Sequence, residues 1–151
     1  MTTARQIASF LAKYDPKIAA DARALRSRLR KIIPGGIEFV YDNYNALVFG
    51  FGPSDRPSEA VLSLAIMPRW VTLCFLKGAK LRDPRKMLRG SGNIVRNIHL
   101  SAPAQLEDRH VRDLIDQAIV NAKPTFTGKP GKQRTVIKSI SAKQRPRRPK
   151  R

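Results

Sequence analysis

The sequence predicts an α+β fold in which helices pack on an antiparallel sheet of about five strands. Two observations along the 151 residues support this prediction. Apolar residues recur at helical spacing up to residue 33, and the apolar period changes to two from residue 37. The predicted strands are joined by short loops, which is typical of a meander and not of parallel crossover units.

Two helices are predicted at the start of the chain. The first begins at Thr2 or Thr3, either of which can cap it, and has apolar residues at helical spacing. The second begins at Asp15-Pro16, because a proline at the first helical position removes a backbone donor that the helix does not use. Pro34 and two glycines end it. Its polar faces are rich in arginine, which is more typical of a solvated face than of a binding face.

Five strands and a last helix follow. The strands are expected at 37–41, 47–51, 61–67, 70–76 and 94–100, and the helix at 108–122, where apolar residues share one stripe. A short helix of one or two turns is predicted between Asp83-Pro84 and Gly90. The strand aromatics are expected to fill the core, since the RNP1 pattern of RNA-binding sheets is absent: Phe39, Tyr41, Phe49, Phe51, Trp70 and Phe75.

Charge divides the chain unevenly. Of the net charge of +19, residues 124–151 carry +10 and have no acidic residue. Their proline, glycine and lysine content predicts a flexible, disordered basic tail behind a folded domain of residues 1–123. Only Thr135–Ser141 breaks the pattern, and this stretch can add briefly to a sheet edge.

The tail predicts contact with nucleic acid or another polyanion, without sequence preference. Such contact needs only accessible cations, and the alternative is a solubilising extension without a selected target. The residues predicted to make this contact are Lys143, Arg145, Arg147, Arg148, Lys150 and Arg151.

The compartment is predicted to be the cytoplasm. A single cysteine, Cys74, excludes an intramolecular disulfide, and the start of the chain lacks the apolar block of a signal peptide. No stretch approaches 18 consecutive apolar residues, so no membrane association is expected. We predict no cofactor or metal, and the sequence indicates no oligomeric state.

Several motifs resemble those of the YdhG-like family of small bacterial domains. They are WVTLCFLKGAKL at 70–81, Asp83-Pro84, LRGSG at 88–92, RNI at 96–98 and the closing helix at 111–119. The resemblance covers about residues 5–122 and implies a compact α+β domain with an antiparallel sheet and packed helices.

Part of that family is described as frataxin-like, which implies a role in iron delivery. The first two predicted helices depart from this role. They contain Asp15 and Asp21 against eight Lys and Arg residues, whereas hard cations such as Fe²⁺ prefer clustered oxygen ligands.

The segment 77–96 is the best candidate for a binding site. Its glycines allow backbone N–H groups to converge on an anion, and its cations raise the local anion concentration. Arg96 is expected on an apolar strand face, where its guanidinium needs a carboxylate, a carbonyl or a bound anion as acceptor. The alternative is a tight turn in a solvated surface. The predicted ligands of a small anion are Lys80, Arg89, Gly90, Ser91, Gly92, Asn93 and Arg96.

These observations favour a non-enzymatic binding module. In this hypothesis the folded domain holds a small anion or a protein partner, and the tail contacts polyanions. One alternative is a frataxin-like iron-delivery protein. Another is an enzyme with an anion site near Gly90–Arg96, for which Asp42, Asp83 and the two histidines are the only visible general bases. His99 and His110 lack the spacing of a metal pair and are expected to face solvent.

Overall fold

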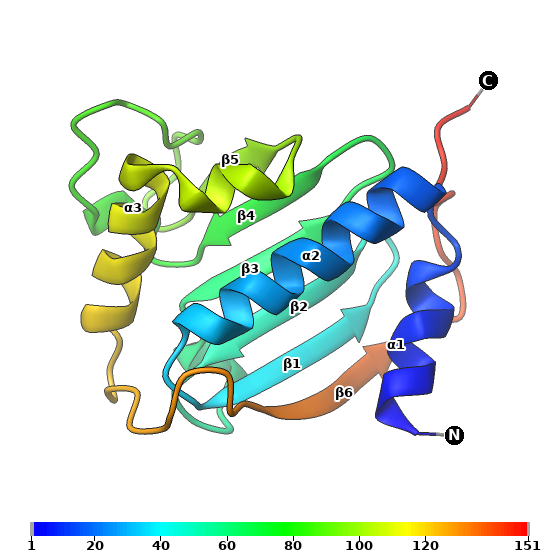
Figure 1. Cartoon of the computed structure of the whole chain (residues 1–151), viewed down its shortest axis with the longest axis horizontal. Coiled ribbons are helices and arrows are strands. Elements are labelled where there is room, and N and C mark those ends of the chain that lie inside the picture. The colour runs from blue at the N-terminus through cyan, green and yellow to red at the C-terminus, as the bar shows by residue number, and fades with distance from the viewer. Residues whose placement is uncertain (1, 151) are drawn as a thin grey trace.

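A computed structural model describes residues 2–150 and shows three α-helices against one six-stranded sheet in that range (Figure 1). The strand order is β5-β4-β3-β2-β1-β6. The helices are α1 (Thr3–Leu11), α2 (Pro16–Ile32) and α3 (Arg109–Val120). The strands are β1 (Ile37–Asp42), β2 (Leu47–Gly52), β3 (Leu62–Ile66), β4 (Val71–Phe75), β5 (Arg96–Leu100) and β6 (Arg134–Ile140).

The predicted α+β class is confirmed, but the predicted sheet is wrong in two respects. The sheet has six strands instead of five, and it is mixed instead of antiparallel. Strands β1 to β5 form the expected antiparallel meander, whereas β6 pairs in parallel with β1. Residues 134–140 are therefore part of the fold, and the expectation of a disordered tail is wrong for them.

A buried carboxylate explains why β6 docks on β1. Glu38 of β1 is fully buried, so its charge must be compensated by donors. Arg26 of α2 binds it in a bidentate manner with both distances at 2.7 Å, and Arg30 donates a further bond. The hydroxyl of Thr135 in β6 donates to the same carboxylate at 2.8 Å. Arg26 and Arg30 thus do not belong to a solvated face.

The chain after β6 is also held by β1. Residues 141–150, which we call the C-terminal arm, run beside the β1–β2 turn, where Arg145 N donates to Tyr44 O at 2.8 Å. Arg147 is only 5% exposed, and its Nη2 donates to Asp42 Oδ1 at 3.0 Å. The prediction of a flexible tail is therefore wrong for these residues as well. The buried carboxylate of Asp42 is paired with Arg147 of the arm and with Lys13, which follows α1.

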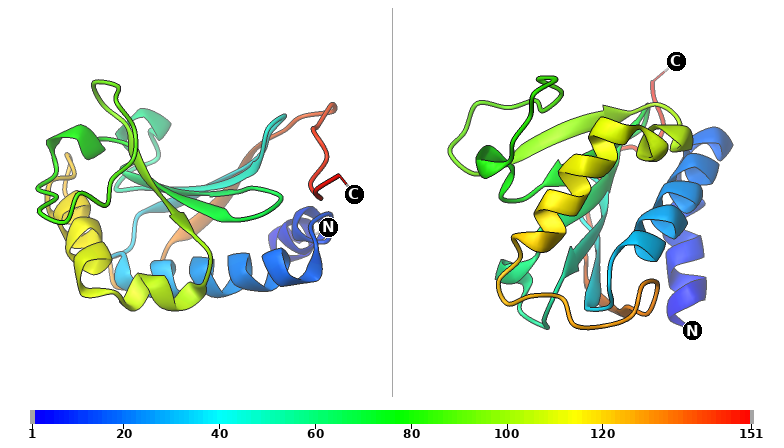
Figure 2. Two further views of the ribbon diagram at one scale, coloured as in Figure 1. Left: turned by 90° about the horizontal axis from the view of Figure 1, so that it is seen from above. Right: turned by 60° about the vertical axis from the view of Figure 1, so that its left-hand side comes forward.

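The helices cover one face of the sheet only (Figure 2). Inward side chains of the central strands form the core with α2 and α3; among them are Phe49, Phe51 and Phe75, which are fully buried. Trp70 does not belong to this core. It is half-buried, and its ring stacks on that of His99 with centroids 4.8 Å apart. The prediction that every strand aromatic fills the core is therefore wrong for Trp70, and it is wrong for Tyr41, which is half-buried and lies outside the core cluster.

Side-chain caps begin two of the helices, and one predicted short helix does not form. Thr2 caps α1 as predicted, since its hydroxyl accepts from Arg5 N at 3.2 Å. Asp108 caps α3 in the same way. The short helix predicted after Asp83 is wrong: the Asp83 carboxylate accepts from Met87 N and Leu88 N, both at 2.9 Å, and closes a turn instead. None of the helices within residues 2–150 has the length and apolar content to cross a bilayer.

Candidate functional site

The glycine-containing loop before β5 does not gather its predicted ligands around one cavity. Arg96 Nη1 donates to the carbonyls of Gly92 and Val95, so this guanidinium is used within its own loop. Arg89 Nη1 instead contacts Nδ1 of His99. Because side chains alternate along a strand, His99 and Arg96 lie on opposite faces of β5, and the two arginines act on opposite sides of the sheet. The loop residues Gly90, Ser91, Gly92 and Asn93 are exposed.

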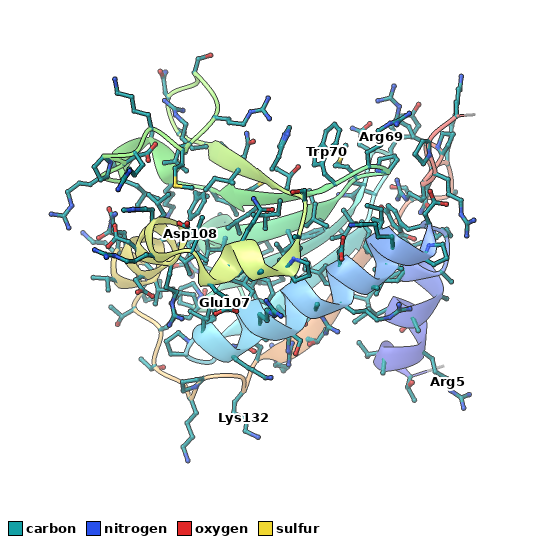
Figure 3. All side chains as sticks on the ribbon, turned by 45° about the horizontal axis from the view of Figure 1, so that its top comes forward. Arg5, Arg69, Trp70, Glu107, Asp108 and Lys132 are labelled. Carbon is teal, nitrogen blue, oxygen red and sulfur yellow. The ribbon has the colours of Figure 1, made fainter. Side chains whose placement is uncertain are left out.

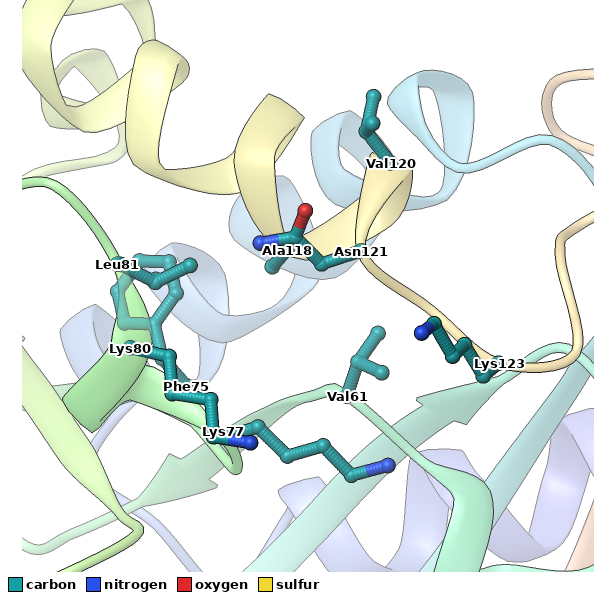
Figure 4. Close-up of a pocket in the computed structure, with 9 residues that line it drawn as sticks. All are labelled: Val61, Phe75, Lys77, Lys80, Leu81, Ala118, Val120, Asn121 and Lys123. Carbon is teal, nitrogen blue, oxygen red and sulfur yellow. The ribbon is translucent and has the colours of Figure 1, made fainter.

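A cavity of about 400 Å³ lies beside this loop, and Lys80 is the one predicted ligand that lines it. We call it the lysine pocket. It lies between β4, the short 3₁₀ helix Gly78–Lys80 and the C-terminal end of α3 (Figure 4). Its cations are Lys77, Lys80 and Lys123, and its apolar residues are Val61, Phe75, Leu81, Ala118 and Val120.

The floor of the lysine pocket is part of the hydrophobic core. Phe75 is fully buried, Val61 is 2% exposed and Ala118 is 6% exposed. A ligand in the pocket would therefore meet an apolar surface that is already rigidly packed.

Two contacts fix the walls of the pocket. The side chain of Gln117 in α3 donates to Arg82 O and accepts from Arg82 N, both at 2.9 Å, which clamps the loop after Lys80 onto α3. Gly78 allows the same loop to approach β5, because a Cβ at this position would lie 2.7 Å from the Cβ of Arg96. The shape of the pocket thus follows from packed elements.

The potential in the lysine pocket is positive. No acidic residue lines it, and within residues 2–150 none of its three lysines has an ion pair or a side-chain hydrogen bond. The carbonyl end of α3 contributes a partial charge of about −0.5. This is small against three ammonium groups, so the pocket favours an anion.

Other chemistry is sparse in the described residues. Within residues 2–150, no group of three or more His, Cys, Asp and Glu side chains comes together as a metal site. Burial raises the pKa of the Cys74 thiol, against the weaker effect of a hydrogen bond with Ser63, so Cys74 is protonated at neutral pH. No His, Asp or Glu lines the lysine pocket as a general base.

Sequence reasoning missed most of this pocket. Lys77 and Lys123 were not among the predicted ligands, and Lys123 is far in sequence from Val61 and Phe75, with which it lines the cavity. The one local signal is that each of these lysines comes shortly after the end of an element, Lys77 after β4 and Lys123 after α3. That signal does not indicate that the two ends meet.

No protein-family model matches this chain, and neither a curated protein nor a solved structure does. The resemblance to the YdhG-like family therefore stays a prediction based on the quoted motifs.

Proposed function

We propose that the protein is a non-enzymatic binding module and that its lysine pocket holds a small organic anion with an apolar body. The observation that supports this function is the combination of three free lysines with a buried apolar floor in one cavity. A carboxylate or phosphate lies at the rim near the lysines, and the apolar part covers Phe75 and Val61.

The apolar body and the charged group of such a ligand are expected to contribute similar amounts to the binding free energy. Burial of about 100 Å² of apolar ligand surface contributes roughly 2.5 kcal/mol. Each exposed ion pair with a lysine adds about 0.2–1 kcal/mol. With ion pairs to all three lysines, these contributions total about 3–5.5 kcal/mol, which corresponds to a dissociation constant of roughly 0.1–5 mM. Neither part alone is therefore sufficient for measurable binding.

Three probes separate these contributions in a calorimetric titration of the full chain. Octanoate has both parts, octanol has only the apolar part, and inorganic phosphate has only the charge. We expect octanoate to bind with the highest affinity. Equal affinity for phosphate would contradict a role for the apolar floor, and equal affinity for octanol would contradict a role for the lysines.

A matched pair of variants tests the location. The triple substitution Lys77→Gln, Lys80→Gln, Lys123→Gln removes the cations of the pocket. The control Lys31→Gln, Lys129→Gln, Lys132→Gln removes the same charge from exposed positions elsewhere. We expect octanoate binding to be lost in the first variant and kept in the control. If both variants bind octanoate equally, the pocket is not its site.

The binding module has more support than the two alternatives. Iron delivery needs grouped oxygen ligands, and the cavity described here is instead lined by lysines. An enzyme at this cavity needs a general base, and no His, Asp or Glu lines the cavity. Stoichiometric Fe²⁺ binding by the protein would favour iron delivery over the binding module.

A further inference from the structure

A second cavity, of about 340 Å³, lies where the C-terminal arm passes the turn between β3 and β4. We call it the C-terminal groove. Arg69 and Trp70 line it from the turn, and Arg145, Arg148 and Lys150 line it from the arm. Figure 3 shows Arg69 and Trp70 next to each other near the end of the chain. The groove shares no residue with the lysine pocket.

The C-terminal groove carries four cations and no lining carboxylate. Arg148 lies 3.5 Å from Asp15, in a pair that is about half exposed on both sides and therefore weak. Within residues 2–150, the side chain of Arg145 makes only a long hydrogen bond, of 3.5 Å, to Asn45 Oδ1. Arg69 and Lys150 have no ion pair within residues 2–150. The groove therefore attracts polyanions.

The groove also has an aromatic wall with a fixed orientation. Trp70 Nε1 donates to the hydroxyl of Thr72 at 3.1 Å, and the indole stacks on His99 with an interplanar angle of 23°. Burial, and then the charge of Arg89, lower the pKa of His99, so its ring is neutral at pH 7. A fixed aromatic ring among cations is the arrangement that proteins use to stack bases and hold phosphates.

The arm presents its cations from an anchored backbone. The buried ion pair between Arg147 and Asp42 holds the arm. Gln144 Nε2 also donates to Asp42 O, at 3.1 Å, and Arg147 Nη1 donates to Tyr44 O, at 3.3 Å. Binding here does not need to order a disordered chain, so that cost is absent from the affinity.

We propose that the C-terminal groove binds single-stranded nucleic acid. A base stacks at Trp70, and the phosphates on either side of it lie between Arg69 and the cations of the arm. Single-stranded DNA and RNA share this chemistry. A polyanion without bases would use the cations and leave Trp70 idle, and duplex DNA hides the faces of its bases.

Trp70 is the only tryptophan of the chain, so its fluorescence reports on this site alone. The full-length protein is titrated with four probes: dT10, rU10, a ten-base-pair duplex and inorganic polyphosphate. We expect both single strands to quench Trp70, and polyphosphate to leave its emission unchanged. Equal quenching by polyphosphate, or no quenching by either single strand, would overturn the proposal.

Substitutions of Trp70 test the stacking by anisotropy of labelled dT10. Trp70→Leu keeps an apolar side chain without an aromatic face, and we expect roughly tenfold weaker binding. Trp70→Phe keeps the face, and we expect a smaller loss. Equal affinities of the two variants would show that stacking does not contribute.

The salt dependence tests the arm. Replacing Arg145, Arg148 and Lys150 by Gln is expected to reduce the slope of log K against log salt by about 2, since each single-strand phosphate contact contributes about 0.7. The control variant replaces Arg23, Lys31 and Lys132 by Gln, with the same change of charge. If the control reduces affinity and slope as much, binding is diffuse and the groove is not the site.

Discussion

Two cationic segments of this protein are alike in composition and differ in structure. Residues 77–95 and residues 124–150 both combine Lys and Arg with glycine and proline. The first segment forms a loop that extends beyond one corner of the sheet (Figure 1). The second contributes an edge strand and an arm that lies against the fold.

The hydrogen bonds of the first segment are within the segment or with β5, apart from those that join Arg82 to Gln117 of α3. Asp83 accepts two backbone bonds from Met87 and Leu88, and Arg96 returns to the carbonyls of Gly92 and Val95. Apolar side chains remain in solvent, as in Ile94, which is 60% exposed. Among the described residues, no Lys or Arg of this loop forms an ion pair with a buried carboxylate.

The second segment contacts β1, the β1–β2 turn and the first two helices, and its buried ion pair is with β1. The inward face of β1 carries two fully buried carboxylates, Glu38 and Asp42. Thr135 of β6 binds the first, and Arg147 of the arm binds the second. A cationic segment is thus ordered where a buried carboxylate and a free strand edge are available to it, whatever its own composition.

The largest loss of stability is expected from Asp42→Asn. This substitution would leave the C-terminal arm, like residues 77–95, without an ion pair to a buried carboxylate. Arg147 would keep a buried charge without a counter-charge, and the free energy of unfolding should fall by about 3 kcal/mol. The arm should also become sensitive to trypsin. Urea unfolding and limited proteolysis measure the two effects.

Asp15→Asn is the matched control, because it removes the exposed carboxylate that pairs with Arg148. It should cost less than about 0.5 kcal/mol. Equal losses in the two variants would mean that burial of Asp42 is not what anchors the arm.

The Asp42 carboxylate is also expected to make the stability of the protein depend on pH. Burial raises the pKa of Asp42, but hydrogen bonds from Lys13, Gln144 and Arg147 outweigh it, so its pKa lies below the usual 3.8. A depressed pKa in the folded state gives stability that is fully present above pH 3.8 and is lost as the pH falls through the folded value.

The stability difference between the natural protein and Asp42→Asn should therefore be constant above roughly pH 5 and narrow below pH 3.8. Urea unfolding of both proteins at several pH values measures it, and every other titrating group cancels in the comparison. A difference that persists at the lowest pH would show that charge does not hold the arm.

A smaller effect is expected where the first segment touches the fold. In Gly78→Ala the new Cβ would meet the Cβ atoms of Arg96 and Phe75 at 2.7 and 2.9 Å. We expect a loss of roughly 1–3 kcal/mol in unfolding free energy and weaker octanoate binding, since the wall of the lysine pocket shifts.

Gly92→Ala, in the same loop, is the control, since nothing lies within 4 Å of its added Cβ. Thermal unfolding compares the two variants. If they lose equal stability, close packing at Gly78 is not the cause.

The smallest effect is expected for Arg96→Leu. It removes two bonds to exposed loop carbonyls, which should cost about 0.5–1 kcal/mol. Octanoate affinity should be unchanged, because Arg96 does not line the lysine pocket. A calorimetric titration that found binding abolished in a folded Arg96→Leu protein would reassign Arg96 as a ligand.

Local patterns were sufficient to predict most elements of the fold. Apolar periodicity placed the three helices and the first five strands, and Thr2 was one of the two residues predicted to cap the first helix. The wrong prediction at Asp83 also has a local cause. Asp83-Pro84 is a pattern typical of a helix start, but the Asp83 carboxylate accepts hydrogen bonds from the backbone N–H groups of Met87 and Leu88 and closes a turn.

Such local patterns could not predict which residues the buried charges pair with. Alternation in the β1 sequence already puts Glu38 and Asp42 on one face, but which face is buried depends on where α2 packs. Local sequence could therefore not assign Arg147 to the interior, or Lys77 and Lys123 to one cavity. Periodicity acts between neighbours in the chain, whereas the pairing of a buried charge is decided between segments that meet only when the core is formed.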